Sequence, residues 1–170
     1  DIFIEKDGTR WAGAKISAGD GQQETYNHFR RYEAVLQAKG TVENGVFALC
    51  LSEPGTVEFD FVSLFPADAV CGIFRRDLFE LLKDMGPGFL RFPGGCIVEG
   101  NTLANRYRFK DSLKPQWARR NNWNRWAVHG NSEQNGYEGI YSHYNQTLGL
   151  GYYEYFLLCE LIGAKPLPVL

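Results

Sequence analysis

The sequence lacks the features that mark several common protein classes. No apolar run approaches the roughly 20 residues that a membrane-spanning helix requires. No charged start with an apolar stretch and a small-residue cleavage site opens the chain. The four cysteines form no CxxC pair, so neither a zinc ribbon nor a redox motif is supported. We therefore expect no membrane partner, no bound metal and no cofactor.

Positive charge is also scarce. The 18 Lys and Arg residues face 20 Asp and Glu residues, and a formal net charge of -2 provides no broad cationic surface for phosphates. Nucleic acid is therefore not expected as a partner. Aromatic residues, in contrast, make up 15% of the chain, and many lie between Tyr107 and Phe156 beside Asn, Arg and His. This mixture suits the binding of sugar rings, although an aromatic-rich core explains it equally well.

The first part of the chain has the pattern of antiparallel strands. Apolar and polar residues alternate in short runs, separated by turn sequences such as Lys6-Asp7-Gly8 and Glu43-Asn44-Gly45. The runs predict strands at residues 1–5, 11–17, 29–36, 46–51 and 56–65. We interpret residues 1–66 as the C-terminal part of a β-sandwich of the jelly-roll type, with upstream strands missing.

After Pro66 the periodicity changes to that of an α/β fold. Leu78, Leu81, Leu82 and Met85 predict an amphipathic helix that ends at Gly86. A strand is predicted at residues 88–92, a helix at 151–162 and a second strand at 166–170. Strand, helix and strand in this order predict a parallel pair. The connection at residues 96–148 is far longer than usual, and such long loops tend to be functional or disordered.

The turn after the first of these strands is the clearest candidate site. If the strands belong to an α/β barrel, residues 93–100 lie at the C-terminal strand ends, where barrel active sites form. Gly94 and Gly95 allow the backbone to approach a ligand, and Cys96 and Glu99 would point into a pocket. Pro-Gly-Gly is, however, a simple turn about as often as a binding loop. His129 and His143 with Glu133 or Glu138 match no compact metal site.

Two motifs stand out in this part of the chain, RRDL at residues 75–78 and LRFPGGCIVEG at 90–100. They resemble motifs of glycoside hydrolase family 51, the α-L-arabinofuranosidases. Weaker matches are FKDSL at 109–113, LGLGYYEY at 148–155 and PLPVL at 166–170, and FDFVSLFP at 59–66 is similar to the end of a carbohydrate-binding-like sandwich. Lys114 and Arg120 depart from the residues common in the family, and residues 121–147 are longer than usual.

The resemblance implies a fold and an activity. The fold would be α/β plus all-β, with residues 67–170 forming the N-terminal part of an incomplete (β/α)8 TIM barrel. The enzyme would be a retaining one that removes terminal α-L-arabinofuranosyl units from arabinan or arabinoxylan, using two glutamates about 5 to 5.5 Å apart. Both lie on later barrel strands of the family, so no catalytic residue is assigned here, and the chain alone is expected to be inactive.

The resemblance also suggests sugar-binding residues, partners and a compartment. Gly94, Gly95, Cys96 and Glu99 would contact the sugar, and Cys96 would lie beside the arabinose ring. Trp123 and Trp126 would stack on a neighbouring sugar or serve as buried structural residues. The partners would be an arabinofuranosyl oligo- or polysaccharide, the rest of the barrel and further copies in a homo-oligomer. A periplasmic or extracellular location is favoured over the cytoplasm. The alternative is a non-catalytic carbohydrate-binding module or scaffold.

Overall fold

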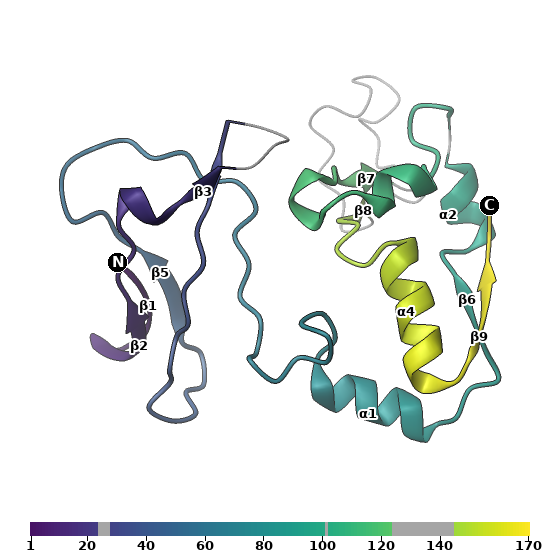
Figure 1. Ribbon diagram of the computed structural model, residues 1–170, viewed down its shortest axis with the longest axis horizontal. Helices are drawn as coiled ribbons and strands as arrows, with labels where there is room; N and C mark the ends of the chain where they lie inside the picture. The colour runs from purple at the N-terminus through teal and green to yellow at the C-terminus, as the bar shows by residue number, and fades with distance from the viewer. Residues whose placement is uncertain (24–27, 101, 124–144) are drawn as a thin grey trace. The chain divides into compact units, whose positions relative to one another are not determined.

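The chain folds into two compact units. The structure is a computed structural model that describes residues 1–23, 28–100, 102–123 and 145–170. One unit is Asp1–Val62 and the other is Ser63–Leu170 (Figure 1), whereas the sequence predicted a boundary after residue 66. Within the described residues, no helix has the length and apolar character needed to cross a membrane.

The first unit is built on a three-stranded antiparallel sheet. Its order is β2 (Thr9–Ala14), β1 (Ile2–Lys6) and β5 (Val46–Leu49), and Phe3 lies opposite Gly13 on one side and Ala48 on the other. The turn between β1 and β2 uses Asp7 and Gly8, both at positive φ. Asp and Gly tolerate this conformation best, so the turn sequence and the three strands are confirmed, with ends shifted by a few residues.

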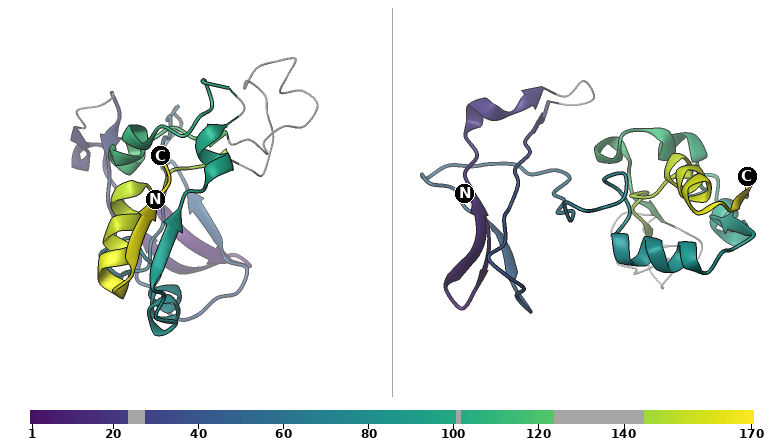
Figure 2. Two further views of the ribbon diagram at one scale, coloured as in Figure 1. Left: turned by 90° about the vertical axis from the view of Figure 1, so that its right-hand side faces the viewer. Right: turned by 60° about the horizontal axis from the view of Figure 1, so that its bottom comes forward.

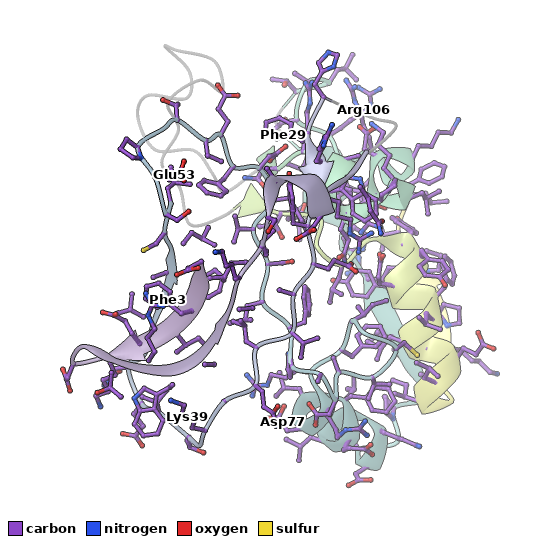
Figure 3. All side chains as sticks on the ribbon, turned by 60° about the vertical axis from the view of Figure 1, so that its left-hand side comes forward. Phe3, Phe29, Lys39, Glu53, Asp77 and Arg106 are labelled. Carbon is purple, nitrogen blue, oxygen red and sulfur yellow. The ribbon has the colours of Figure 1, made fainter. Side chains whose placement is uncertain are left out.

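The small core of the first unit is formed by Phe3 and Ala12, which are buried. The guanidinium of Arg10 lies 3.9 Å from the centre of the Phe3 ring, a cation–π arrangement. Lys39 borders β2, where its backbone N–H donates to the carbonyl of Trp11 at 2.9 Å and its Nζ donates to that of Arg10 at 3.2 Å. Figure 3 labels Phe3, which belongs to β1, and Lys39, which lies outside the strands.

Two predicted strands are wrong. Of residues 29–36, only Arg30–Arg31 is a strand (β4), and it pairs with β3 (Gln22–Gln23). A short 3₁₀ helix, η1 (Ala18–Asp20), comes directly before β3. Residues 56–65 form no strand, although their sequence alternates. Their apolar side chains are exposed: Val57, Phe59, Phe61, Val62, Leu64 and Phe65. A strand needs a neighbour for its backbone and a partner for its apolar face, and the described residues supply neither.

The second unit is centred on a parallel strand pair. β6 (Phe89–Phe92) pairs with β9 (Lys165–Pro168), with Phe89 opposite Lys165, and α4 (Tyr152–Ile162) precedes β9. Figures 1 and 2 show α4 running along the pair. The strand, helix and strand order predicted this parallel arrangement, and the structure confirms it. Gly163 ends α4 in the left-handed conformation at φ 75°, as its position predicted.

The predicted helix before β6 is confirmed, but the prediction of which of its faces is buried is wrong. α1 spans Arg76–Asp84, where the spacing predicted a helix. Its buried residue is Phe79, which stacks on Phe74 with ring centres 6.3 Å apart. Leu78 and Leu81 are 53% and 63% exposed. The apolar stripe is therefore wider than one face, and the described unit covers only the side that carries Phe79 and Leu82.

The connection between β6 and α4 contains several short elements. Its described residues form α2 (Gly95–Glu99), the 3₁₀ helices η2 (Phe109–Leu113) and η3 (Gln116–Ala118), and the antiparallel pair β7 (Asn122–Trp123) and β8 (Asn145–Gln146). The sequence predicted a loop at residues 93–100, so α2 is a correction. Side chains from the connection join a buried cluster of Phe92, Tyr107, Leu148, Tyr152 and Cys159, which positions the connection at the C-terminal end of β6.

Candidate functional site

The turn after β6 has a backbone that only glycine adopts easily. Gly94 has φ 116° and ψ 153°, in the region that side chains disfavour. The peptide bond between Phe92 and Pro93 is cis. α2 begins directly afterwards at Gly95, and the N–H of Val98 donates to the carbonyl of Gly94 at 3.0 Å. The predicted residues Gly94, Gly95, Cys96 and Glu99 therefore share a single tight structural element.

Arg91 lies beside this turn. A methyl group added at Gly94 would lie 3.7 Å from Nη1 of Arg91, and one at Gly95 would lie 3.8 Å from Nη2. Arg91 alternates with Phe92 on β6, so its exposed side chain lies on the face opposite the buried Phe92 ring. The guanidinium thus places positive charge at the end of the strand, next to the two glycines.

The side chains of α2 separate into two groups. Cys96 and Glu99 are exposed and lie three residues apart, which places them on one face of the helix. Ile97 and Val98 pack against the buried cluster around Phe92. The cluster therefore anchors α2 from one side, while Cys96 and Glu99 lie on the exposed side of the helix.

A cavity of about 290 Å³ lies near the same strand end. Its lining combines aromatic rings with amide and hydroxyl groups, from Pro93, Tyr107, Gln146, Thr147, Leu148, Gly149, Leu150 and Tyr155. Burial raises the pKa of the Tyr107 and Tyr155 hydroxyls above the ordinary value of 10.0, so both stay neutral hydrogen-bonding groups at neutral pH. Gly94, Gly95, Cys96 and Glu99 do not line this cavity.

The two predicted tryptophans are not brought to the turn by any described contact. Trp123 belongs to β7, where its backbone is opposite Asn145 in the pair with β8. Trp126 lies outside the described residues, as do His129, His143, Glu133 and Glu138. A stacking role for either tryptophan therefore stays a prediction.

The sequence did not predict an ion pair at the start of α4. Arg119 donates from Nη2 to Oε1 of Glu154 at 2.8 Å and from Nη1 to Oε2 at 3.0 Å. The two side chains are only 4% and 5% exposed. Glu154 also accepts the N–H of Gly151 at 2.7 Å, which satisfies an unpaired donor at the helix N-terminus. A glutamate three residues after a predicted helix start was the one available signal.

Comparison with known proteins shows the family. The domain family described as "Alpha-L-arabinofuranosidase 1 domain" matches residues 81–170, which is more than half of the chain. These residues contain β6, the glycine turn, α2, α4 and β9. The chain belongs to the α-L-arabinofuranosidase family. This confirms the resemblance that the motifs at residues 90–100 and 148–155 indicated.

Named relatives agree with this assignment. The chain is 35% identical over 141 residues to "Alpha-L-arabinofuranosidase 2" of Arabidopsis thaliana, covering 82% of this chain and 19% of that protein. It is also 35% identical over 153 residues to "Extracellular exo-alpha-L-arabinofuranosidase" of Streptomyces chartreusis, covering 82% of this chain and 16% of the relative. The chain thus spans less than one fifth of the length of these two arabinofuranosidases.

Solved structures of arabinofuranosidases are also similar. An arabinose-bound GH51 α-L-arabinofuranosidase matches with 32% identity and a TM-score of 0.42, covering 55% of this chain and 12% of that structure. The arabinose complex of α-L-arabinofuranosidase from Thermotoga maritima matches with 23% identity and a TM-score of 0.43, covering 64% and 18%.

Proposed function

We propose that the protein containing this chain is a retaining α-L-arabinofuranosidase that removes terminal α-L-arabinofuranosyl residues from arabinan or arabinoxylan and their oligosaccharides. The observation that carries the proposal is the family match over residues 81–170, the segment that forms β6, its glycine turn, α4 and β9. In this proposal the two catalytic glutamates lie outside residues 1–170, and these residues alone are inactive.

The proposed architecture is a (β/α)8 barrel in which β6 and β9 are neighbouring strands, with residues 1–66 forming part of a carbohydrate-binding-like sandwich. Parallel pairing of β6 and β9, with α4 before β9, supports the barrel because consecutive barrel strands have this connectivity. The turn at Gly94 and Gly95 would then lie on the C-terminal rim, where barrel enzymes bind substrate.

In the proposed site, Gly94 and Gly95 give a furanose ring close access to the backbone, and Cys96 and Glu99 contact it from α2. The exposure of Cys96 and Glu99 and the position of Arg91 beside the glycines support this arrangement. Trp123 and Trp126 are proposed as a stacking wall for a neighbouring sugar. Export from the cell and assembly into a homo-oligomer are further parts of the proposal.

The first test is hydrolysis of 4-nitrophenyl α-L-arabinofuranoside by the full-length protein. Proton NMR during the first minutes should show the α-anomer of arabinose, because two displacements at one carbon retain configuration. Replacement of Glu99 by Gln should raise KM while largely keeping kcat, since Glu99 is proposed to bind and not to transfer protons. An initial β-anomer would refute the retaining mechanism, and abolished kcat would make Glu99 catalytic.

Alkylation provides an independent test of the site. Bound L-arabinose should protect Cys96 from iodoacetamide, whereas the exposed Cys71 serves as a matched control that the sugar leaves unchanged. Protection of Cys96 without any turnover would favour the alternative of a non-catalytic carbohydrate-binding protein. Equal labelling of both thiols with and without arabinose would remove Cys96 from the site.

A further inference from the structure

The Arg119–Glu154 pair differs from the other described ion pairs in its burial. Both side chains are at most 5% exposed, whereas the Arg75 and Asp77 side chains are 61% and 62% exposed. Burying two charges is costly unless they are paired with good geometry and further hydrogen bonds. The two parallel N–H to oxygen bonds of Arg119 supply that geometry.

Arg119 also donates hydrogen bonds to backbone carbonyls in two parts of the connection that are far apart in the sequence. Its Nε donates to the carbonyl of Lys114 at 2.6 Å, and its Nη1 donates to that of Leu148 at 2.8 Å. Gln116 adds a bond from Nε2 to the carbonyl of Gly149 at 2.8 Å. One guanidinium thus ties residues 114–119 and 148–149 together and fastens both to the first turn of α4.

The 3₁₀ helix η2 is held on the same helix end. The N–H of Tyr152 donates to Oγ of Ser112 at 3.1 Å, and that hydroxyl donates to the carbonyl of Phe109 at 2.7 Å. A side chain on Gly151 would lie 2.2 Å from the carbonyl oxygen of Ser112. The absence of a side chain there lets η2 approach the helix closely, so the N-terminus of α4 anchors residues 109–119 and 148–149 of the connection.

Contacts continue from this anchoring point to the glycine turn. The rings of Tyr152 and Tyr107 lie 5.8 Å apart, and the N–H of Tyr107 donates to the carbonyl of Val98 in α2 at 3.1 Å. Ile97 and Val98 pack against the cluster that contains both tyrosines. A shift of η2 or of the Tyr152 turn would therefore be passed to α2, which carries Cys96 and Glu99.

We propose that Arg119 is a positioning residue. It clamps residues 114–119 and 148–149 onto Glu154 at the start of α4, and in this way it fixes the position of α2 and of the glycine turn. It does not touch substrate in this proposal, and it acts through Tyr107 and Tyr152. The consequence for arabinofuranoside hydrolysis rests on the proposed function, whereas the structural clamp does not. Arg is required because its planar fork reaches the carboxylate and two carbonyls together, which the single ammonium of Lys does not.

The test is Arg119→Lys in the full-length protein, with Arg75→Lys as the matched control. Hydrogen exchange measured by mass spectrometry compares two segments. In α2 the N–H groups of Val98 and Gly100 donate within the turn, and in β9 the N–H of Lys165 donates to the carbonyl of Gly88 at 3.1 Å. We expect exchange in α2 to accelerate by about tenfold or more in Arg119→Lys, with β9 unchanged. Equal acceleration in both segments, or none in α2, would overturn the proposal, because the pair would then serve the fold as a whole or not at all.

The kinetic arm uses the same variants with 4-nitrophenyl α-L-arabinofuranoside at a temperature well below unfolding. Arg119→Lys should lower kcat/KM by about 10- to 100-fold through kcat as well as KM, since misplacement of a binding loop by about 1 Å has effects of this size. A value within twofold of wild type would overturn the positioning role. If the wild type shows no hydrolysis, the proposed function fails, and the exchange experiment still decides on the clamp.

Glu154→Gln provides a second variant in case Arg119→Lys does not fold. A glutamine keeps an acceptor for the N–H of Gly151 but removes the charge and turns one acceptor into a donor facing Arg119. The same local acceleration in α2 is expected with β9 unchanged, and unchanged exchange in α2 would overturn the clamp.

Discussion

Replacement of Gly151 by alanine tests whether close contact between η2 and α4 holds this unit together. Gly151 has φ -111°, which any residue adopts, so backbone strain plays no part in the result. The added methyl group would lie 2.2 Å from the carbonyl oxygen of Ser112 and 2.7 Å from its Cβ. Neither the backbone of Ser112 nor its Cβ can swing away as a flexible side chain would, so η2 and the helix must move apart.

The magnitude follows from two terms. Overpacking in a closely packed site costs about 1 to 3 kcal/mol. Separation also weakens the bond between the Tyr152 N–H and Ser112 Oγ, worth about 1 kcal/mol. We therefore expect a loss of roughly 2 to 4 kcal/mol, which would speed hydrogen exchange of the α4 amides by roughly 30- to several hundred-fold, because 1.4 kcal/mol corresponds to a factor of ten.

The matched control is Gly88→Ala, because an added methyl group there meets nothing within 4 Å. The control should change exchange in α4 by less than about a factor of two, since substitutions in open space have small effects. If Gly151→Ala changes α4 exchange no more than Gly88→Ala does, the contact between η2 and α4 is loose, and the reasoning from close approach is refuted.

Two further predictions concern the buried cluster. Phe92→Ala should lower the free energy of unfolding by about 3 to 5 kcal/mol, because Phe92 is only 2% exposed and its ring contacts the rings of Tyr152, Tyr155 and Phe156. Urea unfolding measures this loss, with Leu81→Ala at an exposed site as the control. Burial raises the pKa of Tyr107, Tyr152 and Tyr155 above 10.0, so the unfolded chain loses these protons first and stability should fall as pH rises through and above 10. Tyrosinate absorbance at 295 nm that tracks free tyrosine up to the unfolding transition would contradict this.

The parts of the fold that the sequence predicted depend on local signals. Residues 89–92 are apolar except for Arg91 and lie between Gly88 and Pro93, and α4 has an apolar core-facing side and is followed by Gly163. These signals predicted β6 and α4 with ends correct to a residue or two. The glycine turn was also found, because adjacent glycines after a strand mark close backbone approach. Its outgoing helix α2 was missed, since five residues are too few to show a helical period.

The parts that were missed depend on contacts distant in sequence. Residues 56–65 alternate like a strand, but pairing decides whether alternation becomes a strand, and the described residues provide no partner. The face of α1 was misjudged because Phe79 and Leu78 are adjacent and only tertiary packing selects between them. Arg119 and Glu154 are 35 residues apart, and no local sequence pattern around either residue predicts that the two pair.

The buried charges of this unit follow from the largely irregular backbone of the described parts of the connection, residues 102–123 and 145–151. A backbone in helices and sheets satisfies its own carbonyls and N–H groups, whereas an irregular connection near a core must find other partners for them. Here the partners are side chains: Arg119 and Gln116 bind carbonyls of the connection, and Ser112 and Glu154 accept the N–H groups at the start of α4. An apolar replacement of the ion pair would fill the same volume but remove the side-chain partners of the Lys114 and Leu148 carbonyls and of the Gly151 N–H. The pair therefore contributes more to the position of the segments at the C-terminal end of β6 than to the stability of the fold. For this reason we expect its loss to increase hydrogen exchange in α2 before it affects the rest of the unit.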